Sequence, residues 1–585
     1  MWRPRTMFVR SRALLPLAAA LIALACREAP EEGGAPVSPF PAGSEMETDF
    51  GQPIRLSYVC GNRFLITNAH DVPVSLRYRV RGSTEEGSVE LAAAPKEDPA
   101  FSEAMLEVRS RGVVELFFEG RPLRARANGG VSCTPATPAP SLLTTGGPED
   151  AGQWTAPFDW HIVGLHLMLL PSGKVLSWGH YGDPQLWDPA TGLFTPVPSP
   201  VLLFCAGHAL TADGRLLAAG GHISDDHGLP NITIFEPAGT WSQSVNMRRG
   251  RWYPTVTSGP NGEMLIVAGV DEAGKVANLP EVWSNGTIRS LTTASKVIPY
   301  YPRMFLAPNG KYFMAGEEAI TASRYLSTAG SGAWSGNFVR RFPDRSYGSA
   351  VMYEFGKILY AGGGFVTNTA EVIDLTKSPP AWQWTGSMAY ARRHLNLTVL
   401  PTGEVLATGG TGGTTGNDLS QAAHAAELWS PTTGQWTTLA SNVVSRGYHA
   451  TSILLPDGRV LHSGSGDASN QPDERNAEIF SPPYLFHGPR PVITAAPAEL
   501  HYGTYAKVST PDPTAITRVT LIRLGAATHA FDMGQRFQQL SFTRTATQIK
   551  TTIPTSRNRT PPGHYMLFLL NAQQVPSVGA IVQVK

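Results

Sequence analysis

One short pattern, a turn glycine followed by a hydrophobic strand, recurs seven times between residues 173 and 461. The first copy is Gly173-Lys174-Val175-Leu176, and the later turn glycines are Gly214, Gly262, Gly310, Gly356, Gly403 and Gly458. Successive glycines are separated, by subtraction, by 41, 48, 48, 46, 47 and 55 residues. Most copies also contain a later strand that ends in a turn, such as Leu186-Trp187-Asp188-Pro189.

Units of about 40–50 residues with four strands each are typical of kelch-type β-propeller blades. Seven such units predict a closed, seven-bladed ring. The alternative is an open array of repeats, which would need capping units with polar outer faces at both ends. The sequence shows no such units, so we expect a propeller.

The composition agrees with an all-β chain of several domains. A length of 585 residues exceeds what one hydrophobic core usually supports. The 59 glycines and 48 prolines indicate frequent chain reversals. Lys and Arg (47) balance Asp and Glu (46), which argues against a nucleic-acid partner. We expect the protein to act as a monomer.

Alternating hydrophobic patterns on both sides of the repeat predict two smaller β domains. The expected organisation is a signal peptide over residues 1–26, a flexible tether over 27–48, an N-terminal β-sandwich over 49–134, a linker over 135–152, the propeller over 153–488 and a C-terminal immunoglobulin-like sandwich over 489–585.

The first residues have the features of a bacterial export signal. A basic start is followed by a short apolar run, and Ala23-Leu24-Ala25-Cys26 resembles a lipobox. The run is too short for a permanent membrane helix. We therefore expect an exported protein held in the cell envelope, or outside the cell, by a lipid on Cys26. Ordinary cleavage after Ala25, without lipid, is the alternative.

The other three cysteines fall into two groups. Cys60 and Cys133 bracket the N-terminal β domain and are expected to form a disulfide in an oxidising compartment. Cys205 lies inside the repeat. In an exported protein, such a cysteine is either a reactive thiol or a small buried hydrophobic residue.

The same offset in every repeat brings unusual side chains together. The first strand of each blade lines the central channel, so one offset marks one height. Nine residues before the turn glycines stand Gly164, Cys205, Tyr253, Tyr301, Tyr347, His394 and His449, and Tyr448 precedes the last of these. Buried strands usually carry small apolar side chains at such positions. Converging thiol, phenol and imidazole groups instead indicate a metal or catalytic site.

The ligand types favour copper(II). Calcium and magnesium would use carboxylates, and structural zinc would use more cysteine or histidine in close pairs. Imidazole nitrogen combined with phenol oxygen suits copper(II) in tetragonal coordination.

Five motifs, in order, resemble the galactose oxidase and glyoxal oxidase family of copper-radical oxidases, from Asp159 to Lys585. They are Phe204-Cys205-Ala206-Gly207, Arg251-Trp252-Tyr253-Pro254-Thr255, Arg446-Gly447-Tyr448-His449, Gly525-Ala526-Ala527-Thr528-His529 and Pro561-Pro562-Gly563-His564-Tyr565-Met566-Leu567-Phe568. The second motif is closer to the glyoxal oxidase branch. The resemblance also implies a propeller followed by an immunoglobulin-like domain.

The resemblance implies a role for each site residue. Cys205 and Tyr253 would be joined by a thioether and would form a tyrosine–cysteine radical. Tyr253, Tyr448, His449 and His529 would bind copper(II), with Tyr448 as axial ligand and general base. The implied reaction is the oxidation of a small primary alcohol or aldehyde by O2, which releases H2O2.

One position departs from the family. Asp271 occupies the place of a tryptophan that stacks over the cross-link in galactose oxidase. A carboxylate does not shield a radical as an indole does, so the radical's stability and galactose as a substrate are both in question. Tyr301 and Arg303 are further candidates for the pocket lining.

Other readings stay compatible with the sequence. A kelch propeller can be a non-catalytic scaffold, because a fold does not determine a function. The protein could also be a carbohydrate-binding surface lipoprotein that uses its N-terminal domain. His222, Asp225, Asp226 and His227 form a weaker metal candidate in a blade loop, where a solvated turn is the more common explanation.

Overall fold

The computed structural model describes residues 54–585 except 61, 69–71, 94–101, 111, 119–120, 127–145, 299, 317–321, 343–344, 365, 414–417 and 468–471. Cys26 and Cys133 lie outside the described residues. The expected lipid attachment and the expected Cys60–Cys133 disulfide therefore lie outside them too. No helix of the described part is long and apolar enough to cross a membrane.

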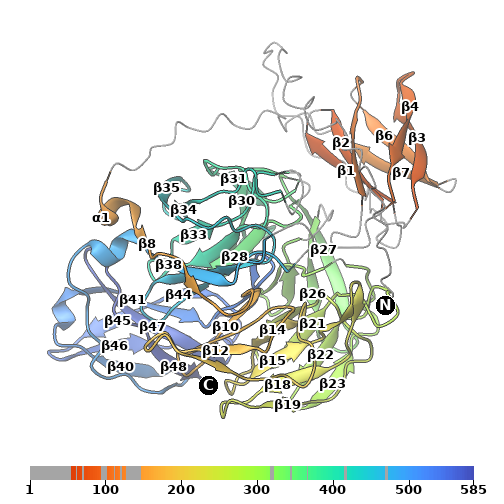
Figure 1. Cartoon of the computed structure of the whole chain (residues 1–585). Helices are drawn as coiled ribbons and strands as arrows, with labels where there is room; N and C mark the ends of the chain where they lie inside the picture. Colours follow the sequence, from red (N-terminus) through yellow and green to blue (C-terminus); the bar gives the residue numbers. More distant parts are fainter. Residues whose placement is uncertain are drawn as a thin grey trace, which may run out of the picture.

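Seven antiparallel sheets, each with four main strands, follow one another along the chain and form the propeller (Figure 1). The first four blades are β10 (His166–Leu169), β11 (Val175–Trp178), β12 (Gln185–Trp187) and β13 (Phe194–Pro196); β14 (Gly207–Leu210), β15 (Leu216–Ala219), β18 (Ile232–Phe235) and β19 (Trp241–Gln243); β20 (Thr255–Ser258), β21 (Met264–Val267), β22 (Glu281–Ser284) and β23 (Thr287–Ser290); β24 (Met304–Leu306), β25 (Tyr312–Met314), β26 (Ala322–Ser327) and β27 (Ala333–Val339).

The last three blades follow the same order. They are β28 (Ser349–Glu354), β29 (Lys357–Ala361), β30 (Ala370–Asp374) and β31 (Trp382–Thr385); β32 (Asn396–Val399), β33 (Val405–Thr408), β34 (Ala425–Trp429) and β35 (Trp436–Ser441); β36 (Ala450–Leu454), β37 (Val460–Gly464), β38 (Asn476–Ser481) and β8 (Gln153–Trp154). The inner two strands of the blades are buried because neighbouring blades cover both of their faces.

The ring is closed by a strand from the beginning of the propeller. The outer strand of the seventh blade is β8, which precedes the first blade in sequence and pairs with β38. The next strand, β9 (Phe158–Asp159), also pairs with β38. A short helix, α1 (Pro148–Ala151), leads into β8. The two ends of the propeller segment are therefore hydrogen-bonded to each other.

The C-terminal domain has two sheets around its own core. One sheet contains β39 (Glu499–Leu500), β48 (Ala580–Val584), β47 (Gly563–Asn571), β41 (Ile516–Arg523) and β44 (Phe537–Leu540), and the other contains β40 (Tyr505–Ser509), β46 (Gln548–Thr552) and β45 (Phe542–Arg544). Two short 3-10 helices complete it, η1 (Pro483–Phe486) before the sheets and η2 (Pro513–Ala515) before β41. This all-β architecture of propeller and sandwich agrees with the fold class expected from the repeat.

Contacts at the turn glycines show which face of the propeller the C-terminal domain covers. A Cβ built at Gly173 would meet Ile581, one at Gly214 would meet His564, and one at Gly403 would meet Phe537. These glycines lie in the turns after the innermost strands. The domain therefore packs against the end of the channel opposite to the corners where the innermost strands begin.

One hairpin leaves this domain and enters the propeller channel. It consists of β42 (Ala526–Thr528) and β43 (Phe531–Asp532). Strand β42 pairs with β10, the innermost strand of the first blade, with His166 opposite Thr528. The tip of the hairpin, which carries His529, is thereby brought up the channel.

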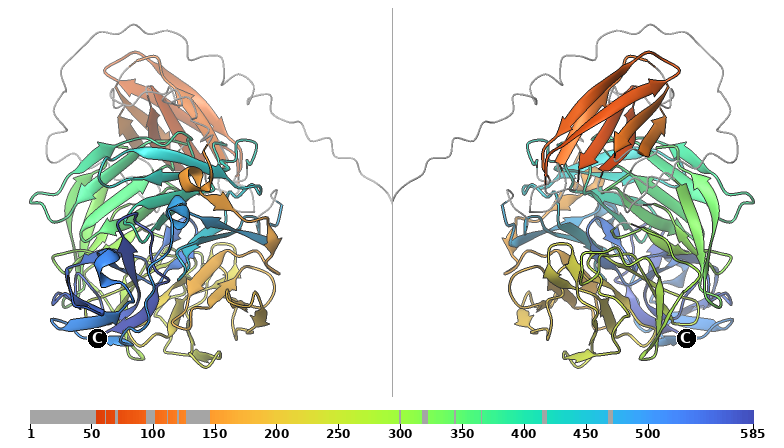
Figure 2. Two further views of the ribbon diagram at one scale, coloured as in Figure 1. Left: turned by 90° about the vertical axis from the view of Figure 1, so that its left-hand side faces the viewer. Right: turned by 90° about the vertical axis from the view of Figure 1, so that its right-hand side faces the viewer.

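The N-terminal β domain stands beside the blades as a unit of its own (Figures 1 and 2). One of its sheets contains β1 (Ile54–Cys60), β2 (Arg63–Asn68) and β5 (Ser102–Glu107), and the other contains β4 (Glu86–Leu91), β3 (Val74–Arg81), β6 (Val113–Phe118) and β7 (Arg121–Arg126). The two sheets enclose a small hydrophobic core that includes Phe64 and Leu116.

Candidate metal centre in the propeller channel

Six side chains of the predicted ring stand at the same kind of backbone corner. Each residue has positive φ just before the innermost strand: Cys205 61°, Tyr253 65°, Tyr301 43°, Tyr347 57°, His394 60° and His449 67°. This conformation is uncommon for residues other than glycine and costs free energy. Backbone hydrogen bonds join neighbouring corners, including Tyr253 N to Cys205 O at 2.9 Å. The repeated corner brings the six side chains to one level of the channel.

His529 meets this ring from the other domain. Its ring centroid lies 4.5 Å from that of Tyr253 and 4.7 Å from that of His449. Tyr448 lies against His449, with centroids 3.8 Å apart, and its hydroxyl hydrogen-bonds the hydroxyl of Tyr253. The structure therefore brings together Tyr253, Tyr448, His449 and His529, which are 276 residues apart at the extremes of the sequence (529 minus 253).

In each of the two imidazoles, Nδ1 is hydrogen-bonded and Nε2 is left available for a metal. The Nδ1 atom of His449 hydrogen-bonds the Gly466 carbonyl at 2.6 Å, and that of His529 bonds the Thr528 hydroxyl at 2.7 Å. The Nε2 atoms of both are buried without a hydrogen-bond partner. Burial lowers the pKa of His449 to about 3 and that of His529 well below its usual range. Both rings are thus neutral, as metal-ligating histidines must be.

The donor set fits copper(II). The described residues contain no group of three or more His, Cys, Asp or Glu side chains that could hold a metal. The channel site differs from such groups, because it combines two neutral imidazoles with the phenols of Tyr253 and Tyr448. Two nitrogens and two oxygens are a set that copper(II) accepts. The unpartnered Nε2 atoms of His449 and His529 are the observation that supports this fit.

Cys205 is held beside Tyr253 by its backbone. Its side chain is completely buried, and its amide donates to Nε2 of His166 at 3.2 Å. The imidazole of His166 stacks on Trp178, with centroids 4.6 Å apart and an interplanar angle of 7°. The Cys205 carbonyl accepts the Tyr253 amide. His166 is a contact that the sequence analysis did not find, since it lies two positions beyond the expected ring position, Gly164.

Tyr301 and Arg303 hold the backbone around the site through hydrogen bonds. The Tyr301 hydroxyl donates to the Ala206 carbonyl at 3.1 Å, and burial, followed by Cys205, raises the pKa of Tyr301 well above its usual value. Arg303 is buried, and its guanidinium donates to the carbonyls of Tyr301 (2.6 Å) and His529 (3.4 Å). Arg303 therefore connects the ring to the inserted hairpin.

Asp271 binds the backbone of its own loop, and a different side chain lies against the ring of Tyr253. The Asp271 carboxylate accepts the amides of Ala273 and Lys275, each at 2.9 Å, and so closes its own loop. The indole of Trp252 lies against Tyr253 instead, with centroids 3.9 Å apart. Trp252 belongs to the Arg-Trp-Tyr-Pro motif, so the sequence contained it. The way its side chain faces Tyr253, however, depends on the positive φ of Tyr253.

The blade loop proposed as a weaker metal candidate forms a hairpin, β16 (His222–Ser224) and β17 (His227–Gly228). His222 accepts the Trp252 indole N–H on Nδ1 at 3.1 Å, and Asp226 accepts the Tyr300 hydroxyl at 2.7 Å. The Nδ1 of His227 bonds the Asp225 carbonyl at 2.8 Å. These contacts position the hairpin and, through Trp252, the surroundings of Tyr253.

Three further aromatic side chains lie close to the ligands. His180 is stacked on Phe204, with centroids 4.3 Å apart. The rings of Phe204 and His449 are nearly perpendicular, with centroids 5.7 Å apart. His394 lies 5.0 Å from Tyr448, and its Nε2 is buried without a hydrogen-bond partner. His394 thus lies beside the site, and its ring packs against the ring of Tyr448.

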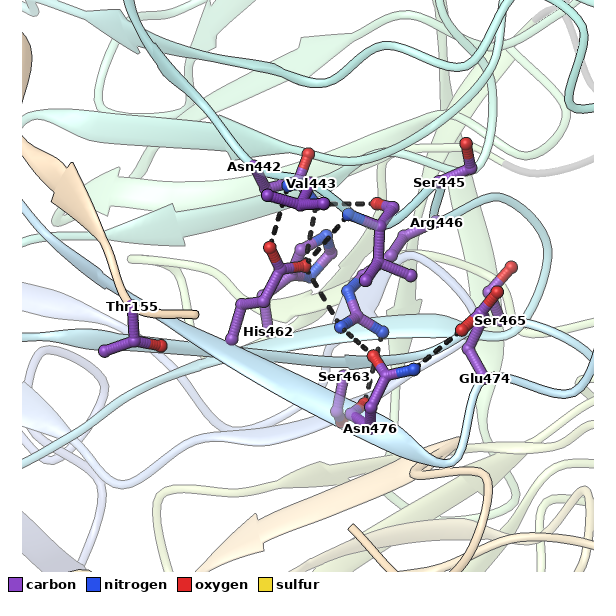
Figure 3. Close-up of polar contacts among 12 residues, drawn as sticks. Thr155, Asn442, Val443, Ser445, Arg446, His462, Ser463, Ser465, Glu474 and Asn476 are labelled. Atoms are coloured by element: carbon purple, nitrogen blue, oxygen red, sulfur yellow. Dashed lines mark hydrogen bonds and ion pairs between the residues drawn. The ribbon is translucent and has the colours of Figure 1, made fainter. Parts of the chain in front are cut away.

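A repeated ion pair between a buried arginine and a glutamate supports the corners. A buried arginine stands two or three residues before four of the ring residues and pairs with a glutamate on the third strand of the same blade. The pairs are Arg251–Glu281 (2.9 Å), Arg345–Glu371 (2.6 Å), Arg392–Glu427 (2.5 Å) and Arg446–Glu478 (3.2 Å). Figure 3 shows the Arg446 guanidinium directed toward Asn476, which it contacts at 2.7 Å. The sequence analysis missed these arginines, although their spacing to the ring repeats.

Known proteins resemble this chain in sequence and fold. A family model described as "Galactose oxidase-like, Early set domain" matches residues 490–584, and one described as "Glyoxal oxidase N-terminus" matches residues 363–484. A galactose oxidase of Gibberella zeae is 28% identical over 487 residues, covering 74% of this chain and 70% of the relative. The aldehyde oxidase GLOX of Vitis pseudoreticulata is 29% identical over 476 residues, covering 72% and 88%.

A solved structure has the same fold. It is a fungal alcohol oxidase of the AA5 family in complex with copper, and it aligns with a TM-score of 0.68 at 23% identity. The alignment covers 74% of this chain and 100% of that one.

Proposed function

We propose that this chain, which resembles the galactose oxidase and glyoxal oxidase family, is a copper-radical oxidase of small primary alcohols or aldehydes. The observation that carries the proposal is the pair of buried, neutral imidazoles with unpartnered Nε2 atoms, His449 and His529. They come from two domains and converge on two phenols. A propeller that served only as a scaffold would have no use for this arrangement.

The site residues divide the work of the proposed reaction. Tyr253, Tyr448, His449 and His529 would hold copper(II), which supplies a one-electron acceptor and a position for the substrate. The Tyr448 phenol, already hydrogen-bonded to Tyr253, would accept the proton of the substrate hydroxyl. The substrate loses two electrons and two protons in all, and O2 takes them up as H2O2.

We further propose that Cys205 and Tyr253 are joined by a thioether. Formation of the bond from Sγ to a ring carbon removes one hydrogen from the thiol and one from the ring. O2 accepts these two hydrogens as H2O2, so the step balances. The burial of Cys205 and the hydrogen bond that the Tyr253 amide donates to the Cys205 carbonyl support this proposal. Trp252, whose ring lies against that of Tyr253 at an angle of 59°, would limit the access of solvent to the resulting radical.

The remaining expectations concern residues outside the described part or the limits of the domains. We propose export with a lipid on Cys26, a Cys60–Cys133 disulfide, and domain limits at residues 49–134, 153–488 and 489–585. Non-reducing peptide mapping of the mature protein tests the disulfide and the lipid together. Two alkylatable thiols at Cys60 and Cys133 would contradict the first, and an unmodified Cys26 would contradict the second.

The function is tested by metal analysis of the purified protein together with a peroxide-release screen on simple alcohols and aldehydes. We expect one copper per chain and peroxide release with at least one substrate. Copper-loaded, aerated protein should also yield one branched peptide containing Cys205 and Tyr253, lighter by two hydrogens than the separate peptides (one from each group). Cys205→Ser should remove that peptide and most of the activity. A linear Tyr253 peptide from copper-loaded protein would favour the alternative hypothesis that the propeller is a non-catalytic scaffold.

A further inference from the structure

Two arginines of the C-terminal domain are buried at its boundary with the propeller. Arg523 ends β41, and Arg536 follows the hairpin that carries His529. They are 3% and 6% exposed. Within the described part of the chain, neither forms an ion pair with a carboxylate, in contrast to the four buried arginines of the blades. Two positive charges are therefore buried together without a negative partner.

The hydrogen bonds of the two guanidinium groups differ. Arg523 donates to the Leu210 carbonyl at 3.0 Å and to the Ser258 hydroxyl at 2.9 Å, and also to the carbonyls of Pro561 and Pro562. Arg536 donates only through Nη2, to the Leu306 carbonyl and the Met352 sulfur, each at 3.3 Å, as far as the described residues go. Its Nε–H and Nη1–H groups have no protein acceptor there. A guanidinium carries five N–H donors, and leaving donors of a buried cation unsatisfied is costly.

A small cavity is lined by both arginines. Its volume is about 30 Å³, and Thr257 and Met533 also line it. Thr257 contributes a buried hydroxyl with no hydrogen-bond partner. The cavity therefore joins a cation with unused donors to a second unused polar group. Both of these observations point to a bound species that accepts hydrogen bonds.

The charge and the size of the cavity restrict that species. Burial lowers the pKa of Arg536 to about 10, so the group stays protonated at neutral pH. A water molecule needs about 10–15 Å³ of such volume, so the cavity has room for a monatomic anion but is too small for sulfate or phosphate. Three methionines, Met304, Met352 and Met533, belong to the apolar part of its wall. The polar side chains of Ser258 and Gln535 also line it, and they are engaged with Arg523 and with the Val399 carbonyl. Apolar, polarisable walls favour a weakly hydrated anion over a strongly hydrated one.

We propose that this cavity binds one halide ion, chloride under ordinary conditions, between Arg536 and Thr257. The ion would offset the charge of Arg523 and Arg536 and join the C-terminal domain to blade 3. Because Arg536 lies four residues after β43, the ion also holds the base of the hairpin that presents His529. This inference does not depend on the proposed oxidase activity.

The first test uses the full-length, copper-free protein. Its Tm is measured in sodium chloride, in sodium bromide and in sodium gluconate at matched ionic strength. A ligand that binds only the folded state stabilises it logarithmically with concentration. For a unit of this size we expect roughly 1–2 °C for each tenfold rise in halide concentration, and no comparable rise in gluconate. Crystals soaked in bromide should show an anomalous peak at the cavity.

Variants distinguish this site from a general salt effect. Arg536→Met removes the charge within a methionine-lined cavity and should abolish the halide dependence of Tm and the bromide peak. Thr257→Val should weaken both, and it serves if Arg536→Met does not fold. Arg557→Gln, an exposed arginine of the same domain, is the control and should behave as the wild type. Equal Tm values in all three salts with no bromide peak would overturn the proposal and leave water in the cavity.

Discussion

The side chains at the channel centre depend on a backbone conformation that most residues avoid. A left-handed corner at a non-glycine residue costs about 1–3 kcal/mol. Cys205, Tyr253 and His449 each adopt one, and so does His529 at the hairpin tip, with φ 45°. Hydrogen bonds between the corners and the buried arginines offset this cost. Strain of this kind, concentrated at one level of the channel, is typical of a functional site.

A substitution can distinguish a proposed copper ligand, His529, from a neighbouring histidine, His394, that is not expected to bind copper. His529→Ala should keep the fold, because the propeller closes without the hairpin tip. It should lose copper, because the variant lacks the Nε2 atom of His529 as a metal ligand. Inductively coupled plasma analysis and circular dichroism measure both properties. His394→Ala is the matched control, since His394 is also buried with an unpartnered Nε2, and it should retain copper. Full copper occupancy in His529→Ala would exclude His529 as a ligand.

His166 is expected to position Cys205 for the thioether. Its Nε2 accepts the Cys205 amide, and burial lowers the pKa of His166 well below its usual range, so the ring is neutral. His166→Phe keeps the stack on Trp178 but removes the acceptor. Loss of one buried hydrogen bond, worth about 1.4 kcal/mol, should slow cross-linking roughly tenfold. Mass spectrometry of copper-loaded protein over time measures the rate.

Two comparisons complete this test. His166→Gln, which retains an acceptor, should recover part of the rate. His208→Phe alters a neighbouring imidazole that bonds the Leu167 carbonyl, and it should leave the rate near the wild-type value. Equal rates for His166→Phe and wild type would refute the positioning role. A wild-type protein that never cross-links would instead refute the thioether itself.

At the scale of the blade, one device repeats. Each buried arginine ties the corner before the first strand to the third strand, so a single blade contains both the ring residue and its support. Most side chains of the outer strands are half exposed or exposed, and the exceptions, such as Trp382 and Leu439, belong to the hydrophobic core. In these four blades, the repeat therefore specifies the position of the ring residue together with its support.

Breaking one such pair should be strongly destabilising. Arg392→Met leaves the Glu427 carboxylate buried without its partner, and the expected loss is about 3–5 kcal/mol in the free energy of unfolding. Arg392→Met combined with Glu427→Leu should recover much of that loss, because neither charge then remains buried. Urea denaturation followed by tryptophan fluorescence measures both. Arg459→Ala, which breaks a partly exposed pair with Asp457, should cost less than about 1 kcal/mol. Similar losses for Arg392→Met and Arg459→Ala would contradict the role of the buried pairs.

At the scale of the molecule, two distant segments complete the propeller. Strand β8 closes the ring from one end of the propeller segment, and the β42–β43 hairpin enters the channel from the C-terminal domain. The candidate metal centre needs both, because the seventh blade carries Tyr448 and His449 and the hairpin carries His529. The site is thus a property of the assembled domains.

The closure can be tested by truncation. A chain beginning at residue 147 should keep the wild-type Tm of the propeller, whereas one beginning at residue 156 lacks β8 and should melt lower. Trp154→Ala in the full chain should have the same direction of effect, since the indole donates to the Ala440 carbonyl at 2.9 Å and packs on Phe480. We expect a loss smaller than about 3–5 kcal/mol, the range typical of a fully buried tryptophan, because Trp154 is half-buried. Equal melting of the two truncated chains would show that β8 does not hold the ring.

The sequence alone determined the number of blades and the level of the channel at which the unusual residues meet. This was possible because a repeat places the same offset at the same height, so Cys205, Tyr253 and His449 could be aligned by counting. Only the tertiary structure decided what lies around them. The Cys205 amide donates to His166 of the preceding blade, β8 closes the ring from the far end of the propeller segment, and Arg536 of the C-terminal domain contacts Leu306 of the propeller. Each of these contacts joins segments that are far apart in the sequence or belong to different blades or domains. Such contacts depend on the direction of side chains after the ring has closed, and no local pattern encodes that direction.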